Sequence, residues 1–264
     1  MADLDSLRSD LAAELADLDA VVAGLDDEAW LTRTPAQGWD VRDSISHLAG
    51  SDAAAVLAVS RPDEFAARLP AVAADPDGFI QHDIDQGRAM PPAGVLEWWR
   101  GGRAVMLDAF SGLDPAQRIP WFGPPLGPAS FITARLMETW AHGQDVVDAL
   151  GVRREPTARL RHVADIGVRT RGFSYVLRGR SAPDVPVRVE LTAPDGDVWT
   201  WGPSEAVDRV TASAYGFCLL VTQRRHRSDV DVQATGAAAA EWLDIAQAFA
   251  GLPGPGRLPT PPDL

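Results

Sequence analysis

Three side chains suited to metal binding or proton transfer recur at helical spacing in the stretch RLMETWAHGQDVVDAL, residues 135–150. Glu138 and His142 are four residues apart, and Asp145 follows three residues later. Residues three and four apart lie on one face of an α-helix, so all three side chains point the same way. A helix that needed only a core stripe would carry leucine or valine there. Either this face meets water, or its side chains converge on something that they bind.

Glu138 and His142 have the i, i+4 spacing that lets two side chains hold one ion. A third ligand must come from another segment, and the best-placed histidine is His47 in GWDVRDSISHLAGSD, with small serines one turn away on either side. Three protein ligands leave positions open for water or substrate, as in catalytic zinc, and nickel or cobalt accept the same donors. Asp145 is then an outer base or substrate anchor. Spacing alone does not decide the matter, because E-x-x-x-H also occurs on solvated helix faces.

These segments belong to a series of expected helices. Apolar spacing predicts helices over residues 4–25, 40–59 (with Asp40 as the N-cap), 77–90, 93–113, 135–150 and 157–177. The Ala-rich segment 62–74 is ambiguous, and IPWFGPPLGPAS, with four prolines and two glycines, is expected to be an ordered loop or a break. One helix after another is typical of a bundle.

The pattern changes near the C-terminus. The segment PVRVELTAPDGDVWTW alternates on both sides of a Pro-Asp-Gly-Asp turn, which predicts a β-hairpin. A helix over 212–222, a strand over 229–234 and a helix over 237–250 follow. We therefore expect an α+β chain with a helical domain over 1–180 and a small α+β domain over 181–264. The proline-rich tail PGPGRLPTPPDL is expected to wrap the surface or to stay loose.

Composition excludes several classes of function. A net charge of −13 and a pI near 4.7 argue against nucleic acid or an anionic membrane as partner. No apolar run approaches the roughly 20 residues of a membrane span, and the acidic N-terminus is unlike a signal peptide. The single cysteine, Cys218, fits a reducing cytoplasm. The absence of lysine and asparagine excludes Schiff-base lysine chemistry and an asparagine oxyanion hole.

The pairing of GWDVRDSISHLAGSD with LMETWAHGQDVVDALG resembles the DinB-like metalloprotein superfamily, and within it the mycothiol-dependent maleylpyruvate isomerase family of actinobacteria. The resemblance covers nearly the whole chain. It implies a four-helix metal-binding domain followed by a small, sterol-carrier-like α/β domain. It also implies that His47, Glu138 and His142 bind a divalent ion, zinc before nickel or cobalt. Asp145 matches the family aspartate that follows the second histidine.

The same resemblance implies arginines that hold the anionic thiol cofactor or an acidic substrate, because guanidinium pairs with carboxylate in a bidentate manner. The segment FCLLVTQRRH points to Arg224 for both cofactor binding and catalysis, and Arg88 is a second catalytic candidate. Gln223 precedes Arg224 where a small residue is expected, so the local turn departs from the family pattern.

These observations together predict a metal-dependent enzyme that uses a low-molecular-weight thiol, mycothiol, against an electrophilic or acidic small molecule. A thiolate produced at the ion would add to carbon, giving either S-transfer or isomerisation. The open site and the anion clamp follow from residues, whereas the thiol follows only from the resemblance. A metal-dependent hydrolase and a non-catalytic metal or small-molecule binding protein stay open as alternatives. The sequence does not predict the oligomeric state.

Overall fold

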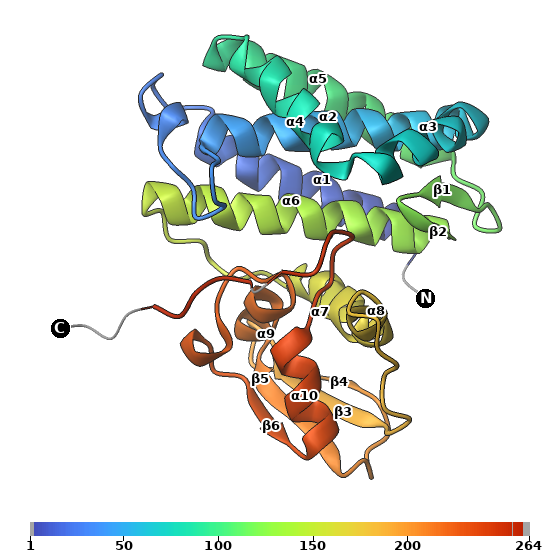
Figure 1. Cartoon of the computed structure of the whole chain (residues 1–264). Helices are drawn as coiled ribbons and strands as arrows, with labels where there is room; N and C mark the ends of the chain where they lie inside the picture. Colours follow the sequence, from blue (N-terminus) through green and yellow to red (C-terminus); the bar gives the residue numbers. More distant parts are fainter. Residues whose placement is uncertain (1–2, 255, 261–264) are drawn as a thin grey trace. The chain divides into compact units, whose positions relative to one another are not determined.

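The computed structural model describes residues 3–254 and 256–260. It divides the chain into two compact units, Met1–Arg154 and Glu155–Leu264 (Figure 1). Each unit has its own core and is described by itself.

The first unit is built around four long helices, which can be followed in Figure 1. They are α1 (Leu4–Val22), α2 (Val41–Ser60), α5 (Pro92–Ala109) and α6 (Pro128–Leu150). Helix α2 packs against both α5 and α6, and α1 packs against α6. Their apolar stripes supply a buried core that includes Leu11, Ile45, Trp99 and Leu136. The structure thus confirms the predicted helical bundle, with α2 and α6 carrying the candidate ligands side by side.

Two shorter helices, α3 (Pro62–Ala74) and α4 (Pro76–Arg88), lie between α2 and α5 in the chain and pack onto α2. Each begins with proline at its first position, where the missing N–H costs no hydrogen bond. The ambiguous segment 62–74 is therefore a helix. The proline-rich segment contains a small hairpin of β1 (Ile119–Trp121) and β2 (Gly123–Leu126).

The second unit is built on a four-stranded sheet in the order β4-β3-β5-β6. Strand β3 (Val187–Thr192) pairs antiparallel with β4 (Val198–Trp201), as the hairpin signal predicts. It also pairs parallel with β5 (Asp208–Ser213), which in turn pairs antiparallel with β6 (Gln233–Thr235). The helices of this unit are α7 (Leu160–Arg169), α8 (Arg171–Val176), α9 (Ala214–Val221) and α10 (Ala237–Ile245). An α+β fold class is confirmed.

The first two of these helices join the second unit, so the division lies before the expected boundary after residue 180. Gly167 of α7 meets Phe217 and Val221 of α9, where an added Cβ would come within 2.7 Å of the valine. The thiol of Cys218 lies 3.5 Å from the carbonyl oxygen of Leu160. Helix α7 therefore packs closely on α9 and belongs to the core of the second unit. Sequence periodicity does not predict such a contact between two helices. Cys218 is fully buried, and burial raises the pKa of its thiol well above the ordinary value.

Other element boundaries differ from the sequence expectations for local reasons. The helix expected over 157–177 is broken at Thr170, whose hydroxyl donates to the carbonyl of Ile166. Strand β5 was not expected, because its first residue, Asp208, is a buried carboxylate that accepts from the amide of Ala239. Strand β6 is shorter than 229–234 suggests, and α10 ends at Ile245. Residues 255 and 261–264 of the expected tail lie outside the described residues.

Helix α9 ends in a Schellman motif around Gln223, whose φ of 60° is left-handed. The amide of Gln223 donates to the carbonyl of Leu220 at 2.9 Å, and that of Arg224 donates to Leu219 at 2.7 Å. Glycine adopts this conformation at the least cost, which explains why a small residue is expected there. The turn forms with glutamine in its place. Among the residues that the structure describes, no helix is long and apolar enough to cross a membrane.

A carboxylate packed between α4 and α2 makes stability pH-dependent. Asp83 lies against Gly50, where an added Cβ would come within 2.0 Å of the carboxyl carbon. Burial raises the pKa of Asp83 to about 6, against the opposing charge of His82. The folded protein binds this proton more tightly than the unfolded chain, in which the pKa is about 3.9. Proton binding by Asp83 therefore stabilises the fold fully below about pH 3.9, and this contribution is lost as the pH rises through about 6.

Asp83→Asn is therefore expected to stabilise the protein at pH 7.5 and to change little at pH 4. The full shift corresponds to about 3 kcal/mol, and the partial exposure of this side chain reduces the expected gain to about 1–2 kcal/mol. Urea unfolding of the metal-free protein across pH 4–8 measures it, with exposed Asp85→Asn on the same helix as control. A gain that does not grow between pH 4 and 7.5 would contradict this reading.

Candidate metal centre

Three donor side chains from α2 and α6 converge within the first unit. His47 projects from α2, while Glu138 and His142 project from successive turns of α6. Their ligand atoms all lie within 4.8 Å of one another. Glu138 Oε2 and His142 Nε2 are 3.5 Å apart. Two ligands at about 2.0–2.1 Å from a tetrahedral ion stand about 3.3 Å apart, so this pair has the separation that one ion requires.

The donors also suit a divalent ion by type and by access. Two imidazole nitrogens and one carboxylate oxygen form the set that zinc, nickel and cobalt accept. His142 is buried, whereas His47 and Glu138 are only partly covered, so the group is not sealed from small molecules. The residues present therefore fit an ion with three protein ligands and open positions.

Asp145 lies behind His142 rather than among the ligands. Its Oδ2 is 3.7 Å from Nδ1 of His142, on the side of the ring away from Glu138. Asp145 is itself buried. A carboxylate in this position favours the tautomer with its proton on Nδ1, which leaves Nε2 for the ion. The structure thus brings together all three predicted ligands and the predicted aspartate.

The charge state of Glu138 suits a ligand. Burial by itself would raise the pKa of this carboxyl. The hydrogen bond and charge of His142, together with the charges of Arg135 and His47, outweigh burial and lower the pKa to about 2. Glu138 is therefore ionised at neutral pH, as metal binding requires.

Trp39 covers the two histidines, a contact that residue spacing does not predict. Its ring centroid lies 5.3 Å from that of His47 and 5.7 Å from that of His142, nearly parallel to the latter. The two imidazoles are themselves 4.7 Å apart in a T-shaped arrangement. The backbone carbonyl of Trp39 accepts from the amide of Thr34 at 2.9 Å, which fixes the loop before α2. The one sequence signal for Trp39 is its place directly before the helix cap.

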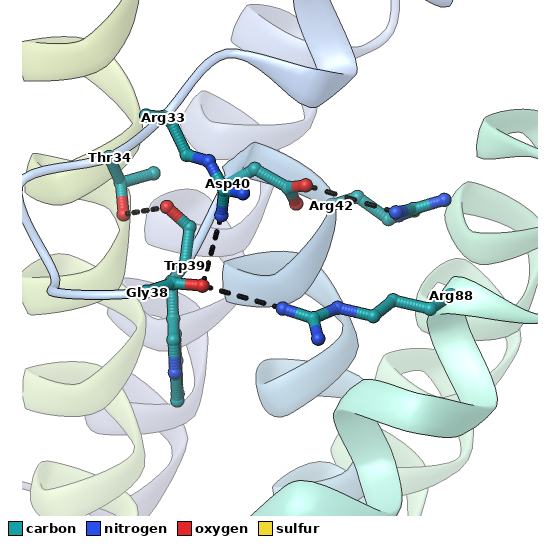
Figure 2. A pocket seen from close by; sticks show the side chains of 7 residues that line it. All are labelled: Arg33, Thr34, Gly38, Trp39, Asp40, Arg42 and Arg88. Atoms are coloured by element: carbon teal, nitrogen blue, oxygen red, sulfur yellow. Dashed lines mark hydrogen bonds and ion pairs between the residues drawn. The ribbon is translucent and has the colours of Figure 1, made fainter.

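A cavity of about 500 Å³ opens beside this loop, between the start of α2 and the end of α4 (Figure 2). We call it the arginine cavity. It is lined by Arg33, Thr34, Gly38, Trp39, Asp40, Arg42 and Arg88. Neither Arg33 nor Arg42 was singled out from the sequence, since no spacing rule marks a surface arginine.

Arg88, a predicted catalytic residue, stands on the wall of this cavity and pairs with Asp43. Its Nε donates to Oδ1 of Asp43 at 2.9 Å and its Nη2 donates to Oδ2 at 2.7 Å. This pairing raises the pKa of Arg88. Asp43 forms a capping box with Asp40 at the start of α2, so Arg88 braces the helix that carries His47.

Arg224, the predicted cofactor anchor, lies in the second unit directly after α9. Its Nη1 donates to the carbonyl of Thr222 at 2.7 Å, within the turn that contains Gln223. Its role as an anchor stays a prediction.

The first unit matches a known family along most of its length. The family described as "Mycothiol maleylpyruvate isomerase N-terminal domain" matches residues 11–147, a span that includes all three candidate ligands and Asp145. The chain belongs to this family. A second family, described as "Wyosine base formation", matches residues 183–235 in the second unit.

Two relatives and two solved structures match most of the chain. Two uncharacterized proteins from two strains of Mycobacterium tuberculosis are 48% identical over 257 residues, covering 97% of this chain and 100% of theirs. A crystal structure of the mycothiol-dependent maleylpyruvate isomerase matches 88% of this chain and 93% of its own, with a TM-score of 0.61 and 14% identity. A histidine-to-alanine mutant of that enzyme matches with a TM-score of 0.60. At this identity the likeness establishes a shared fold, which agrees with the predicted resemblance.

Proposed function

We propose that this member of the maleylpyruvate isomerase family is a metal-dependent enzyme that uses a small thiol, mycothiol, against an electrophilic small molecule. The observation that carries the proposal is the convergence of His47, Glu138 and His142, with ligand atoms within 4.8 Å of one another, inside the matched family span. Zinc is the first choice of ion, and nickel or cobalt suit the same donors. A reducing cytoplasm, in which thiols persist, is the expected location.

Each residue of the site has a separate role. His47, Glu138 and His142 hold the ion, which when bound lowers the pKa of a thiol or water beside it. Asp145 orients His142 through its charge and is a buried carboxylate beside that ring, able to hold a proton during the reaction. The ring of Trp39 shields the two histidines on one side and limits water there.

Addition of the thiolate sulfur to an electrophilic carbon forms a C–S bond. If a proton then neutralises the new carbanion, the product is a thiol conjugate and the reaction is an S-transfer. If the carbanion instead rotates and expels the thiolate, a double bond returns in the other geometry and the reaction is an isomerisation. S-transfer and isomerisation both need the same metal ligands, so the site supports the two reactions together as one proposal.

The arginine cavity supports an acidic substrate. Arg42 Nε is buried with no hydrogen-bond partner, and the nearest carboxylate, on Asp40, is 3.8 Å from Nη2. Arg33 donates from Nη1 to the carbonyl of Gly38 and keeps other donors exposed. Because Arg88 is already paired with Asp43, Arg42 offers the better-placed guanidinium. We propose that Arg42 binds a substrate carboxylate, and we keep Arg224 as the residue that the family resemblance implies for the anionic thiol cofactor.

Arg42→Gln is accordingly expected to raise KM for an acidic electrophile about tenfold, since a charge-assisted hydrogen bond contributes about 1.5 kcal/mol. Maleylpyruvate serves as the acidic probe and monochlorobimane as a neutral one, both with mycothiol in excess. KM for the neutral probe should stay within about twofold, because it has no carboxylate to lose. Equal increases for both probes would contradict a carboxylate contact.

The overall proposal is tested with zinc-loaded protein, mycothiol and monochlorobimane, beside metal-stripped protein. Metal-dependent formation of the conjugate is the expected result. Consumption of an ester probe without any thiol would overturn thiol use in favour of a hydrolase. A tightly held ion with no turnover of either probe would overturn the enzyme assignment in favour of a binding protein.

A further inference from the structure

A fully buried ion pair joins the two helices that carry the candidate ligands. Arg135 of α6 is 2% exposed and Asp52 of α2 is inaccessible. Arg135 Nη2 donates to Oδ1 of Asp52 at 2.8 Å and to the hydroxyl of Ser51 at 2.9 Å. The helices themselves are packed together, so this contact lies inside their interface. We call these three residues the Arg135 clamp.

The clamp lies one helical turn from the ligands on both helices. Arg135 precedes Glu138 by three residues, and Ser51 follows His47 by four. Residues at these spacings share a helix face, so Arg135 lies on the face that carries Glu138 and Ser51 lies on the face that carries His47. A slide or rotation of one helix that separated Arg135 from Ser51 would also move Glu138 relative to His47. The two sets of contacts are therefore mechanically linked.

Burial makes the clamp selective for one arrangement. A charged guanidinium and a carboxylate in the interior are stable only while they are paired and hydrogen-bonded. Any other register of α2 against α6 would separate them and leave buried charges without a partner, at a large desolvation cost. Apolar side chains at the same positions would tolerate sliding by part of a turn. The clamp thus specifies a register as well as contributing to packing.

We infer that the Arg135 clamp is a positioning device that sets Glu138 against His47 at the spacing one ion requires. The inference rests on the proposed metal site, and the clamp residues themselves do not contact the ion. Its pair is electrically neutral as a whole. Removing both charges together leaves the net charge unchanged, but Arg135 also acts on the charge of Glu138. The ligand geometry is therefore read separately from the affinity.

The decisive variant is the charge-neutral double change Asp52→Leu with Arg135→Met. Zinc affinity is measured per folded protein by competition with a chromophoric chelator, and the visible spectrum of the cobalt-loaded protein reports ligand geometry. We expect affinity to fall by about 10–100-fold, the range seen when groups that orient metal ligands are lost, and the cobalt bands to shift. Unchanged affinity and spectrum in the folded double variant would overturn the inference.

A matched control separates positioning from general stability. Asp19 of α1 accepts a bidentate contact from Arg100 and a second contact from Arg103, both on α5, so this cluster joins two helices that carry none of the ligands. Asp19→Leu with Arg100→Met removes one negative and one positive charge from it, and zinc affinity should stay within about twofold. An equal loss of affinity in this control would also overturn the inference.

A milder variant decides the question if the double variant does not fold. Ser51→Ala removes one hydroxyl that accepts from Arg135 and keeps the ion pair. We expect a twofold to fivefold loss of zinc affinity in a protein that stays folded, and unchanged affinity would overturn the inference. Absence of stoichiometric zinc binding by the unmodified protein would instead refute the proposed metal site, so the two failures are distinguishable.

Discussion

His142→Ala is expected to lower zinc affinity by about 100-fold or more and to abolish metal-dependent turnover. The imidazole supplies one of three ligands, and its Nε2 is 3.5 Å from the carboxylate of Glu138. With two ligands from different helices left, the ion loses most of its coordination energy. Metal content after dialysis, together with competition against a chromophoric chelator, measures the loss. Unfolding in urea should remain cooperative, because His142 lies at the site rather than in the apolar core.

Asp145→Asn provides the graded comparison for that variant. It keeps the size of the side chain beside Nδ1 of His142 but removes the charge that favours the metal-binding tautomer. We expect a loss of about tenfold in zinc affinity, between the unmodified protein and His142→Ala. Normal zinc content in His142→Ala would remove that residue from the coordination sphere. Equal effects of the two changes would make Asp145 a ligand rather than an orienting group.

Local geometry explains which parts of the site were predictable. Glu138, His142 and Asp145 belong to one helix, so their shared face follows from 3.6 residues per turn and from nothing else. His47 lies on a different helix, so the residues marked it only as the best-placed histidine, and the family resemblance supported its pairing with the other two ligands. Trp39 and Arg42 depend on the path of the loop before α2, which no periodicity encodes. The arrangement of a site across separate segments is set by tertiary packing, which the spacing within one segment does not contain.

Elements of the fold were predictable where the sequence has a local periodic signal. Amphipathic helices and the β3–β4 hairpin have strong periodic signals, and both are confirmed. Strand β5 begins with the buried carboxylate of Asp208, and a charged residue in a sheet interior hides the alternation that marks a strand. The structure divides the chain after Arg154, and the contact of Gly167 with Val221, which joins α7 to the second unit, lies between segments that are far apart in the sequence.

Asp52→Ala is expected to destabilise the protein by about 3–5 kcal/mol, the largest single effect on stability that the structure indicates. The carboxylate is inaccessible and accepts from Arg135 at 2.8 Å. Alanine would leave the guanidinium buried without its counter-charge, keeping only the hydroxyl of Ser51. Urea unfolding of the metal-free protein measures the loss. Asp5→Ala, which breaks an exposed pair with Arg8, should cost less than about 1 kcal/mol.

The double change Asp52→Leu with Arg135→Met should cost far less than Asp52→Ala alone, within about 2 kcal/mol of the unmodified protein. Apolar side chains remove both charges and fill the same space. Burial already raises the pKa of Asp52 although Arg135 acts to lower it, so desolvation is not fully compensated. The ion pair therefore adds little to stability, and its main effect is to fix the register of the two helices that carry the ligands. If the double variant is nearly as stable as the parent yet binds zinc weakly, stability and metal geometry are separate properties of the same two residues.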